Sequence, residues 1–143
     1  MAHIVILGAG LGGLSMAFAM RKAARDGDSV TVISDDTHFH FVPSNPWVAV
    51  RWRQREDISV ELRPVLEKKN VGFDATGAQR VHPERNEIEL TDGRTIAYDY
   101  LIIATGPKLA FDEIEGLGPQ GHTASICHID HAEQAVELVV GLT

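Results

Sequence analysis

Short runs of aliphatic and β-branched residues at 4–7, 30–33 and 101–104 stand out along the chain. Runs with so little polar interruption predict strands buried on both faces of a parallel sheet. Good helix formers fill residues 14–24, between the first two runs, and residues 71–75 predict a further strand. A strand, a helix and a second strand within about 30 residues form a βαβ unit, so the sequence predicts a Rossmann-like α/β fold.

The pattern changes between residues 78 and 98, where the helical period is lost. Glu87–Leu90 and Thr95–Tyr98 alternate in polarity on either side of a turn that contains Asp92 and Gly93. Alternation around an Asp-Gly turn is typical of antiparallel hairpins. We therefore expect an antiparallel β-meander, at about residues 78–98, inserted into the parallel fold.

Prolines and a possible helix start shape the segments between these strands. Pro43 and Pro46 predict an extended, irregular loop that reaches toward a site. A helical region could open at Asp57, although Pro64 delays its regular part to about residue 61.

The last predicted helix begins near Asp130. Asp130 and Glu133 have the spacing of an N-cap and N3 pair, and apolar residues follow on one helical face. Either this face or residues 109–111 would leave apolar surface uncovered, so we expect self-association into a homo-oligomer.

Length and composition narrow the class of protein. The 143 residues, 44% of them apolar, fit one domain with a single core. A formal net charge of -7 argues against nucleic-acid binding. The single cysteine, Cys127, cannot form an internal disulfide, and no apolar run reaches the roughly 20 residues that span a bilayer. No leader-like segment precedes residue 4, so a cytoplasmic location is expected.

Glycines follow the first predicted strand at once. Gly8, Gly10 and Gly13 satisfy the G-x-G-x-x-G pattern, and Gly12 adds a fourth glycine. Gly8 allows a tight turn, Gly10 lets a pyrophosphate approach the backbone, and Gly13 lets helix and strand pack closely. The unpaired N–H groups at the start of the helix complete an anion site. Residues 1–143 are therefore expected to form a dinucleotide-binding domain.

The end of the second strand is expected to hold a ribose. Dinucleotide-binding proteins usually carry Asp or Glu there, hydrogen-bonded to the ribose hydroxyls. This chain has Ser34, Asp35 and Asp36 at that place. Either Ser34 binds the ribose, or Asp35 does so one position later; the alternative is that both aspartates are solvated turn residues.

A second motif covers residues 98–107, where Asp99 precedes the apolar strand and Ala104-Thr105-Gly106 ends it. Gly106 would allow close approach to the backbone, and Asp99 would fix the strand entrance through hydrogen bonds to the backbone. After the meander, this combination resembles the second flavin-binding motif of the two-dinucleotide-domain flavoprotein reductases. The resemblance implies FAD as the cofactor.

Within that superfamily, Phe41–Trp47 and Thr105–Phe111 resemble the sulfide:quinone oxidoreductases, and the likeness spans essentially the whole chain. It implies a flavoenzyme that oxidises sulfide at a cysteine pair on one side of FAD and reduces a membrane quinone on the other. It also implies two sets of cofactor contacts, with Gly77 and Ala78 at the adenine and Pro43, Ser44 and Gly106 nearer the flavin.

Other polar side chains leave alternatives open. Cys127 matches a peripheral cysteine of many members of this family; a structural zinc site needs about four ligands, so no metal is expected beside it. His38 and His40 either relay protons near a quinone or form the polar face of a strand. Residues 51–55 form the only basic cluster, either a solvated loop or a contact to a flavin phosphate or a partner.

Members of the family are longer than this chain. A second glycine-rich domain, the redox cysteine pair and C-terminal membrane-binding helices find no match in residues 1–143. We therefore expect an N-terminal FAD-binding portion that is inactive alone, with the intact enzyme peripheral to the membrane through its C-terminal region. Two alternatives stay open: a type II NADH dehydrogenase-like flavoprotein, and a stand-alone nucleotide-binding module without catalysis. The segment Pro43–Trp47 favours a sulfide:quinone oxidoreductase over a type II NADH dehydrogenase.

Overall fold

The computed structural model describes residues 1–141, except for the side chains of residues 139 and 140. It divides into two compact units, one formed by Met1–Phe39 and Glu61–Gly106 and the other by His40–Val60 and the described part of Pro107–Thr143. Each unit has an apolar cluster of its own, whereas composition suggested a single core. Composition counts apolar residues without showing which of them pack together, so it could not reveal this division.

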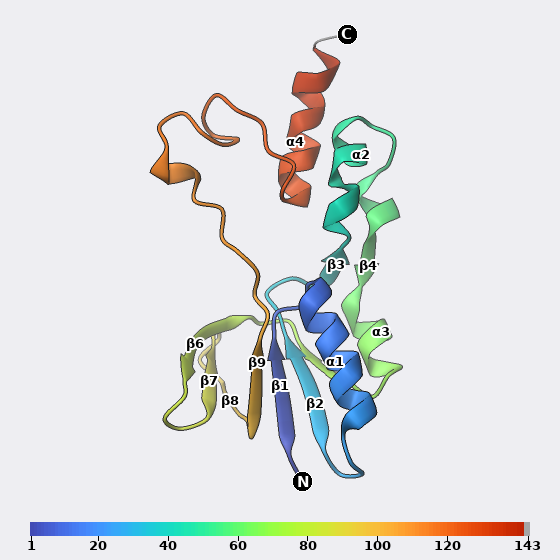
Figure 1. Ribbon diagram of the computed structural model, residues 1–143, viewed down its shortest axis with the longest axis vertical. Helices are drawn as coiled ribbons and strands as arrows, with labels where there is room; N and C mark the ends of the chain where they lie inside the picture. The colour runs from blue at the N-terminus through green and yellow to red at the C-terminus, as the bar shows by residue number, and fades with distance from the viewer. Residues whose placement is uncertain (142–143) are drawn as a thin grey trace. The chain divides into compact units, whose positions relative to one another are not determined.

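Four parallel strands form the centre of the first unit (Figure 1). They are β1 (His3–Leu7), β2 (Ser29–Ile33), β5 (Gly72–Asp74) and β9 (Tyr100–Ile103), in the order β5-β2-β1-β9. The inner strands β1 and β2 carry the most deeply buried apolar runs, as predicted. Because every pairing is parallel, the carboxyl ends of all four strands lie at one edge of the sheet, where α/β proteins bind ligands.

Helices cover one face of this sheet. The helices are α1 (Leu11–Ala23) and α3 (Leu62–Glu67), and they bury a cluster that includes Ile6, Ala17 and Leu66. The first helix begins three residues earlier than its composition suggested, because two glycines of the motif lie in its first turn. The helical region expected from residue 57 is divided: a short strand intervenes, and regular helix begins at Leu62, close to the expected position.

The meander covers the other face. It consists of β6 (Ala78–His82), β7 (Glu87–Leu90) and β8 (Thr95–Ala97), paired antiparallel in sequence order. Ile88 and Leu90 of β7 are fully buried against apolar side chains of β1 and β2. The predicted α/β fold with an inserted antiparallel meander is confirmed (Figure 1).

The entrance to β9 is held by the aspartate that precedes it. The His3 N–H donates to Asp99 Oδ2 at 2.6 Å, and the Asp99 N–H donates to the His3 carbonyl at 2.9 Å. These two bonds align the beginnings of β1 and β9. The predicted role of Asp99 is confirmed.

Short helices dominate the second unit. Its described helices are 3₁₀ turns at Val42–Ser44, Arg55–Ile58 and Phe111–Glu113, together with α2 (Asn45–Ala49) and α4 (Ile129–Val140). Its buried cluster comprises Val48, Ile58, Ile129 and Ala132. Two further strands, β3 (His38–His40) and β4 (Ser59–Glu61), pair with each other. Within residues 1–141, no helix is long and apolar enough to cross a membrane.

The two prolines do not produce the expected extended loop. Pro43 and Pro46 lie in the first two positions of the 3₁₀ helix and of α2. The first N–H groups of a helix have no acceptor within it, so a proline is tolerated there and its fixed φ suits the helix. The loop prediction is wrong, and the segment is helical.

Asp130 and Glu133 do not cap α4, which begins at Ile129 and contains both of them. Their spacing of three residues places both carboxylates on one face. Arg55 Nη1 contacts Asp130 Oδ1 at 2.6 Å and Glu133 Oε2 at 3.0 Å. The hydrogen bond from Arg55 lowers the pKa of Asp130 below its ordinary value. The pattern that suggested a cap therefore belongs to an ion pair with a residue 75 positions earlier, which local spacing cannot reveal.

Candidate functional site

The turn after β1 needs its first glycine. Gly8 has a φ of +105°, a conformation that side chains with a Cβ rarely adopt, and its N–H donates to the Ile33 carbonyl at 2.8 Å. A Cβ on Gly8 would lie 2.4 Å from the Ala104 carbonyl oxygen. The end of β1 therefore passes too close to the end of β9 for any other residue.

The other glycines of the motif divide into a packed one and two open ones. A Cβ on Gly13 would lie 2.0 Å from the Gly8 carbonyl oxygen, so the first turn of α1 packs directly on the turn below it. Cβ atoms on Gly10 or Gly12 would meet no protein atom within 4 Å. The predicted division of roles is thus visible: one glycine permits packing, and the others leave the backbone accessible.

The start of α1 is suited to an anion. Gly10 is its N-cap and makes no side-chain cap bond, and its first turn contains no acidic residue. The first N–H groups of a helix lack intrahelical acceptors and carry partial positive charge. With the open backbone at Gly10 and Gly12, they offer donors to a diphosphate without a competing carboxylate.

A cleft of about 230 Å³ lies at the carboxyl edge of the parallel sheet. It is lined by Leu7, Gly8, Ile33, Ser34, Asp35, Gly77, Ala78, Thr91 and Thr105. The cleft brings together residues expected at the diphosphate, the ribose and the adenine, from segments that lie far apart in the sequence.

The two residues predicted to bind the ribose differ in burial and in their hydrogen bonds. Ser34 is buried, its N–H donates to the Asp74 carbonyl at 3.0 Å, and its Oγ accepts the Asp36 N–H at 3.2 Å. The carboxylate of Asp35 is exposed, and among the described residues it has no hydrogen-bond or ion-pair partner. Both residues line the cleft. Of the two, only Asp35 has a side-chain acceptor without a partner among the described residues, whereas the hydrogen bonds of Ser34 hold the backbone at the end of β2.

The end of β9 closes the cleft beside the glycine turn. The Ala104 N–H donates to the Leu7 carbonyl at 2.8 Å, which extends the pairing of β1 and β9 by one residue. Thr105 follows, exposed and lining the cleft. Gly106 has a φ of +72°, and a Cβ on it would meet nothing within 4 Å, so the backbone is approachable there as expected.

Three predicted site residues lie in the second unit. Pro43 is exposed and Ser44 is buried, both in the 3₁₀ helix Val42–Ser44. Cys127 is an exposed free cysteine whose N–H donates to Ser125 Oγ at 3.2 Å. In the part of the chain that the structure describes, no group of three or more His, Cys, Asp or Glu side chains gathers for a metal ion.

The basic cluster is partly engaged within its own unit. Arg53 lies over the ring of Trp47, at 5.1 Å from the ring centroid, and Arg55 binds the two carboxylates of α4. His40 Nδ1 lies 2.7 Å from Ser59 Oγ, and His38 Nδ1 lies 3.0 Å from Thr37 Oγ1. These contacts give the basic cluster and the two histidines structural partners. Neither the residues of the cluster nor the histidines line the cleft of the first unit.

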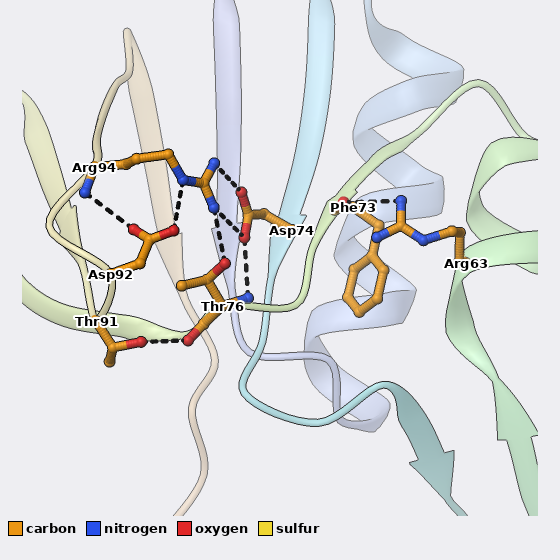
Figure 2. A network of polar contacts seen from close by, with 7 residues as sticks. All are labelled: Arg63, Phe73, Asp74, Thr76, Thr91, Asp92 and Arg94. Carbon is orange, nitrogen blue, oxygen red and sulfur yellow. Dashed lines mark hydrogen bonds and ion pairs between the residues drawn. The ribbon is translucent and has the colours of Figure 1, made fainter.

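Thr91 is a polar residue of the cleft lining that the sequence did not single out as a site residue. Thr91, in the turn between β7 and β8, donates its hydroxyl to the Thr76 carbonyl at 2.6 Å (Figure 2). Its N–H also donates to the Gly77 carbonyl at 3.2 Å. A threonine in a hairpin turn carries no local signal of such a role. Only the docking of the meander on the sheet brings it to the cleft.

A βαβ unit with a G-x-G-x-x-G turn at a helix start, and a cleft at the carboxyl ends of its strands, defines a dinucleotide-binding protein. Residues 2–140 match the family described as pyridine nucleotide-disulphide oxidoreductase, and the chain belongs to that family.

Two sequence relatives and two solved structures illustrate the likeness. The chain is 42% identical over 130 residues to the sulfide-quinone reductase of Aquifex aeolicus, covering 91% of this chain and 29% of the relative. It is 32% identical to the mitochondrial sulfide:quinone oxidoreductase of Dictyostelium discoideum, covering 97% of this chain and 31% of the relative. The crystal structure of the sulfide:quinone oxidoreductase from Aquifex aeolicus superposes with a TM-score of 0.92 at 39% identity, covering 99% of this chain and 32% of that one. The structure of NDH2 from Plasmodium falciparum in complex with NADH superposes with a TM-score of 0.76 at 25% identity. That match covers 94% of this chain and 28% of the NDH2 chain.

These comparisons confirm the resemblance drawn from residues 41–47 and 105–111. They also confirm an oxidoreductase family with this α/β fold. The chain spans 29% and 31% of the length of the two sequence relatives. The individual cofactor contacts, and the assignment of residues 1–143 to one domain, stay predictions.

Proposed function

We propose that this chain is the FAD-binding part of a flavoprotein oxidoreductase that oxidises sulfide and reduces a quinone. The observation that carries the proposal is the cleft at the carboxyl edge of the sheet, where the glycine turn, the free carboxylate of Asp35 and the segment Gly77–Ala78 meet. The family is one of FAD-dependent enzymes, and its sulfide:quinone oxidoreductase members share most of this chain.

The residues present fit an adenine dinucleotide. The open glycines Gly10 and Gly12 and the start of α1 suit the diphosphate, and the carboxylate of Asp35 suits the ribose hydroxyls. Gly77 and Ala78 line the cleft and are the residues proposed to contact the adenine. In this proposal Ser34, Thr105 and Gly106 complete the contacts, and Pro43 and Ser44 lie toward the flavin. Bound FAD would supply the chemistry of accepting two electrons and passing them on.

The sequence contains one cysteine, Cys127. A cysteine pair that takes electrons from sulfide cannot form within these residues, so Cys127 is assigned a peripheral role. We propose that residues 1–143 alone do not turn over, and that the intact enzyme works in the cytoplasm, peripheral to the membrane through segments other than those described.

Retention of FAD tests the proposal directly. The purified chain, incubated with FAD and freed of unbound cofactor, is expected to keep a flavin absorption spectrum, because diphosphate, ribose and adenine contacts all lie within it. Isothermal titration with FAD, ADP and NADH separates the alternatives. If the chain binds ADP but not FAD, it is a nucleotide-binding module without flavin. If NADH reduces the bound flavin, the result favours the NADH dehydrogenase-like alternative. Binding of none of the three would overturn the proposal.

Exposed apolar surface supports a second, independent proposal, that copies of this chain associate. Leu138 on α4 is 59% exposed, and Ile114 is 61% exposed. Leu109 and Phe111, which were expected to contribute, are only partly exposed. Sedimentation velocity is expected to show a concentration-dependent shift toward dimers, reduced in Leu138→Gln because a polar side chain weakens apolar contact. A single monomer peak at all concentrations would contradict it.

A further inference from the structure

Gly77 and Ala78 form one wall of the cleft, at the end of the short segment Asp74–Ala78 that joins β5 to the meander. Gly77 has a φ of +81°, and a Cβ on it would lie 3.0 Å from the Cβ of Asp35. The segment thus packs closely on the residue that offers its carboxylate to the ribose. Any shift of this wall changes the width of the cleft at the adenine and ribose positions.

Alongside hydrogen bonds from Thr91, a guanidinium links this segment to the turn of the meander (Figure 2). Arg94 directly precedes β8. Its Nη1 donates to Asp74 Oδ2 at 2.9 Å, and its Nη2 donates to Asp74 Oδ1 at 3.3 Å. Nη2 also donates to Thr76 Oγ1 at 2.8 Å, and Nε donates to Asp92 Oδ2 at 2.6 Å. The guanidinium thus donates four hydrogen bonds in its planar fork geometry, which a lysine cannot reproduce.

Asp74, which Arg94 binds, also accepts hydrogen bonds from the backbone around the cleft. Its Oδ1 accepts the Thr76 N–H at 3.0 Å, and its carbonyl accepts the Ser34 N–H at 3.0 Å. Burial of the Asp74 carboxylate acts to raise its pKa, but the hydrogen bonds from Arg94 and Thr76 outweigh burial and the pKa lies below its ordinary value. The carboxylate is therefore ionised at neutral pH, and Arg94 is the cation that compensates it.

Without Arg94, two carboxylates would face each other across the junction. Asp74 and Asp92 would both lose their cation, and Thr76 Oγ1 would lose its donor. The bonds from Thr91 to the carbonyls of Thr76 and Gly77 would still join the segment to the turn of the meander, but no cation among the described residues would remain between Asp74 and Asp92. Repulsion between like charges would then favour an open, less ordered wall.

We propose that Arg94 is a positioning residue for the adenosine half of the nucleotide, acting through Asp74 and Thr76 on the wall formed by Gly77 and Ala78. This inference rests on the function proposed above. Arg94 itself does not line the cleft. Its effect is to set the geometry of residues that do.

The test compares Arg94→Met with a matched control, Arg85→Met. Arg85 lies in the same meander and is 54% exposed, against 56% for Arg94. Its ion-pair partners Glu84 and Glu87 belong to the meander and do not line the cleft. Dissociation constants for ADP and FAD are measured by isothermal titration, at a temperature at which circular dichroism shows every variant fully folded. Arg94→Met is expected to weaken both ligands on the order of tenfold, Arg94→Lys to recover part of this, and Arg85→Met to bind like the parent chain.

Each outcome decides the matter. If Arg94→Met melts at a lower temperature but binds ADP as the parent does, Arg94 has only a structural role and the inference fails. Equal losses in Arg94→Met and Arg85→Met would also overturn it, because the effect would then follow meander charge in general. If the parent chain binds ADP but not FAD, the flavin assignment fails while the ADP series still decides the role of Arg94. If it binds neither ligand, both proposals fail.

Discussion

Gly8→Ala is expected to lower the free energy of unfolding by at least about 3 kcal/mol, measured by urea denaturation without ligand. Two costs combine. The φ of +105° is strained for any residue with a Cβ, and that Cβ would lie 2.4 Å from the Ala104 carbonyl oxygen. The neighbouring atoms are backbone of Ala104 and Thr105, directly after β9, and they cannot move without disturbing the Ala104–Leu7 hydrogen bond and the adjoining pairing of β1 with β9.

Gly12→Ala is the matched control for this variant. A Cβ there would meet nothing within 4 Å, and alanine favours helix over glycine by up to about 1 kcal/mol. Its unfolding free energy is expected to equal or exceed that of the parent. If the two variants unfold at the same urea concentration, the tight turn after β1 does not require glycine at position 8.

Asp35→Ala is expected to weaken FAD and ADP binding by about 2 kcal/mol, which is roughly 30-fold, with little change in unfolding free energy. The carboxylate has no protein partner among the described residues, so its removal costs the fold little. Alanine keeps the Cβ on which Gly77 packs, so the wall of the cleft stays in place. Isothermal titration measures the loss.

Asp26→Ala is the control for charge, since Asp26 is an exposed aspartate of the same unit outside the cleft. Ser34→Ala separates the two ribose candidates. If the serine binds the ribose, Ser34→Ala will lose affinity and Asp35→Ala will not. Because Ser34 Oγ accepts the Asp36 N–H, Ser34→Ala is also expected to lose about 1 kcal/mol of stability, which Asp35→Ala should not.

The parallel strands and the glycine turn were predictable because their determinants are local. An unbroken apolar run such as Ile4–Leu7 is stable only when both faces are covered, which implies a central strand. The glycine spacing 8, 10 and 13 specifies a turn and a helix start within six residues. The meander was predictable for the same reason, because polar and apolar residues alternate on either side of the Asp92-Gly93 turn and this pattern involves only neighbours along the chain.

Other features were out of reach because their determinants are distant. Asp130 and Glu133 match a cap by spacing, yet Arg55, 75 positions before Asp130, determines what they do. Pro43 and Pro46 break helices when internal and suit them when initial, and only the neighbouring contacts decide which applies.

The sequence by itself determined the α/β fold with its meander, the glycine turn and the family resemblance, because each depends on residue types at short, regular spacing. The tertiary structure alone decided that the Asp35 carboxylate has no partner among the described residues, while Ser34 is engaged by the backbone. It also decided that Arg94 reaches Asp74, 20 positions away, and that Thr91 reaches the cleft. The physical reason is that hydrogen-bond partners are assigned when separate elements pack, and this information does not lie in any one segment.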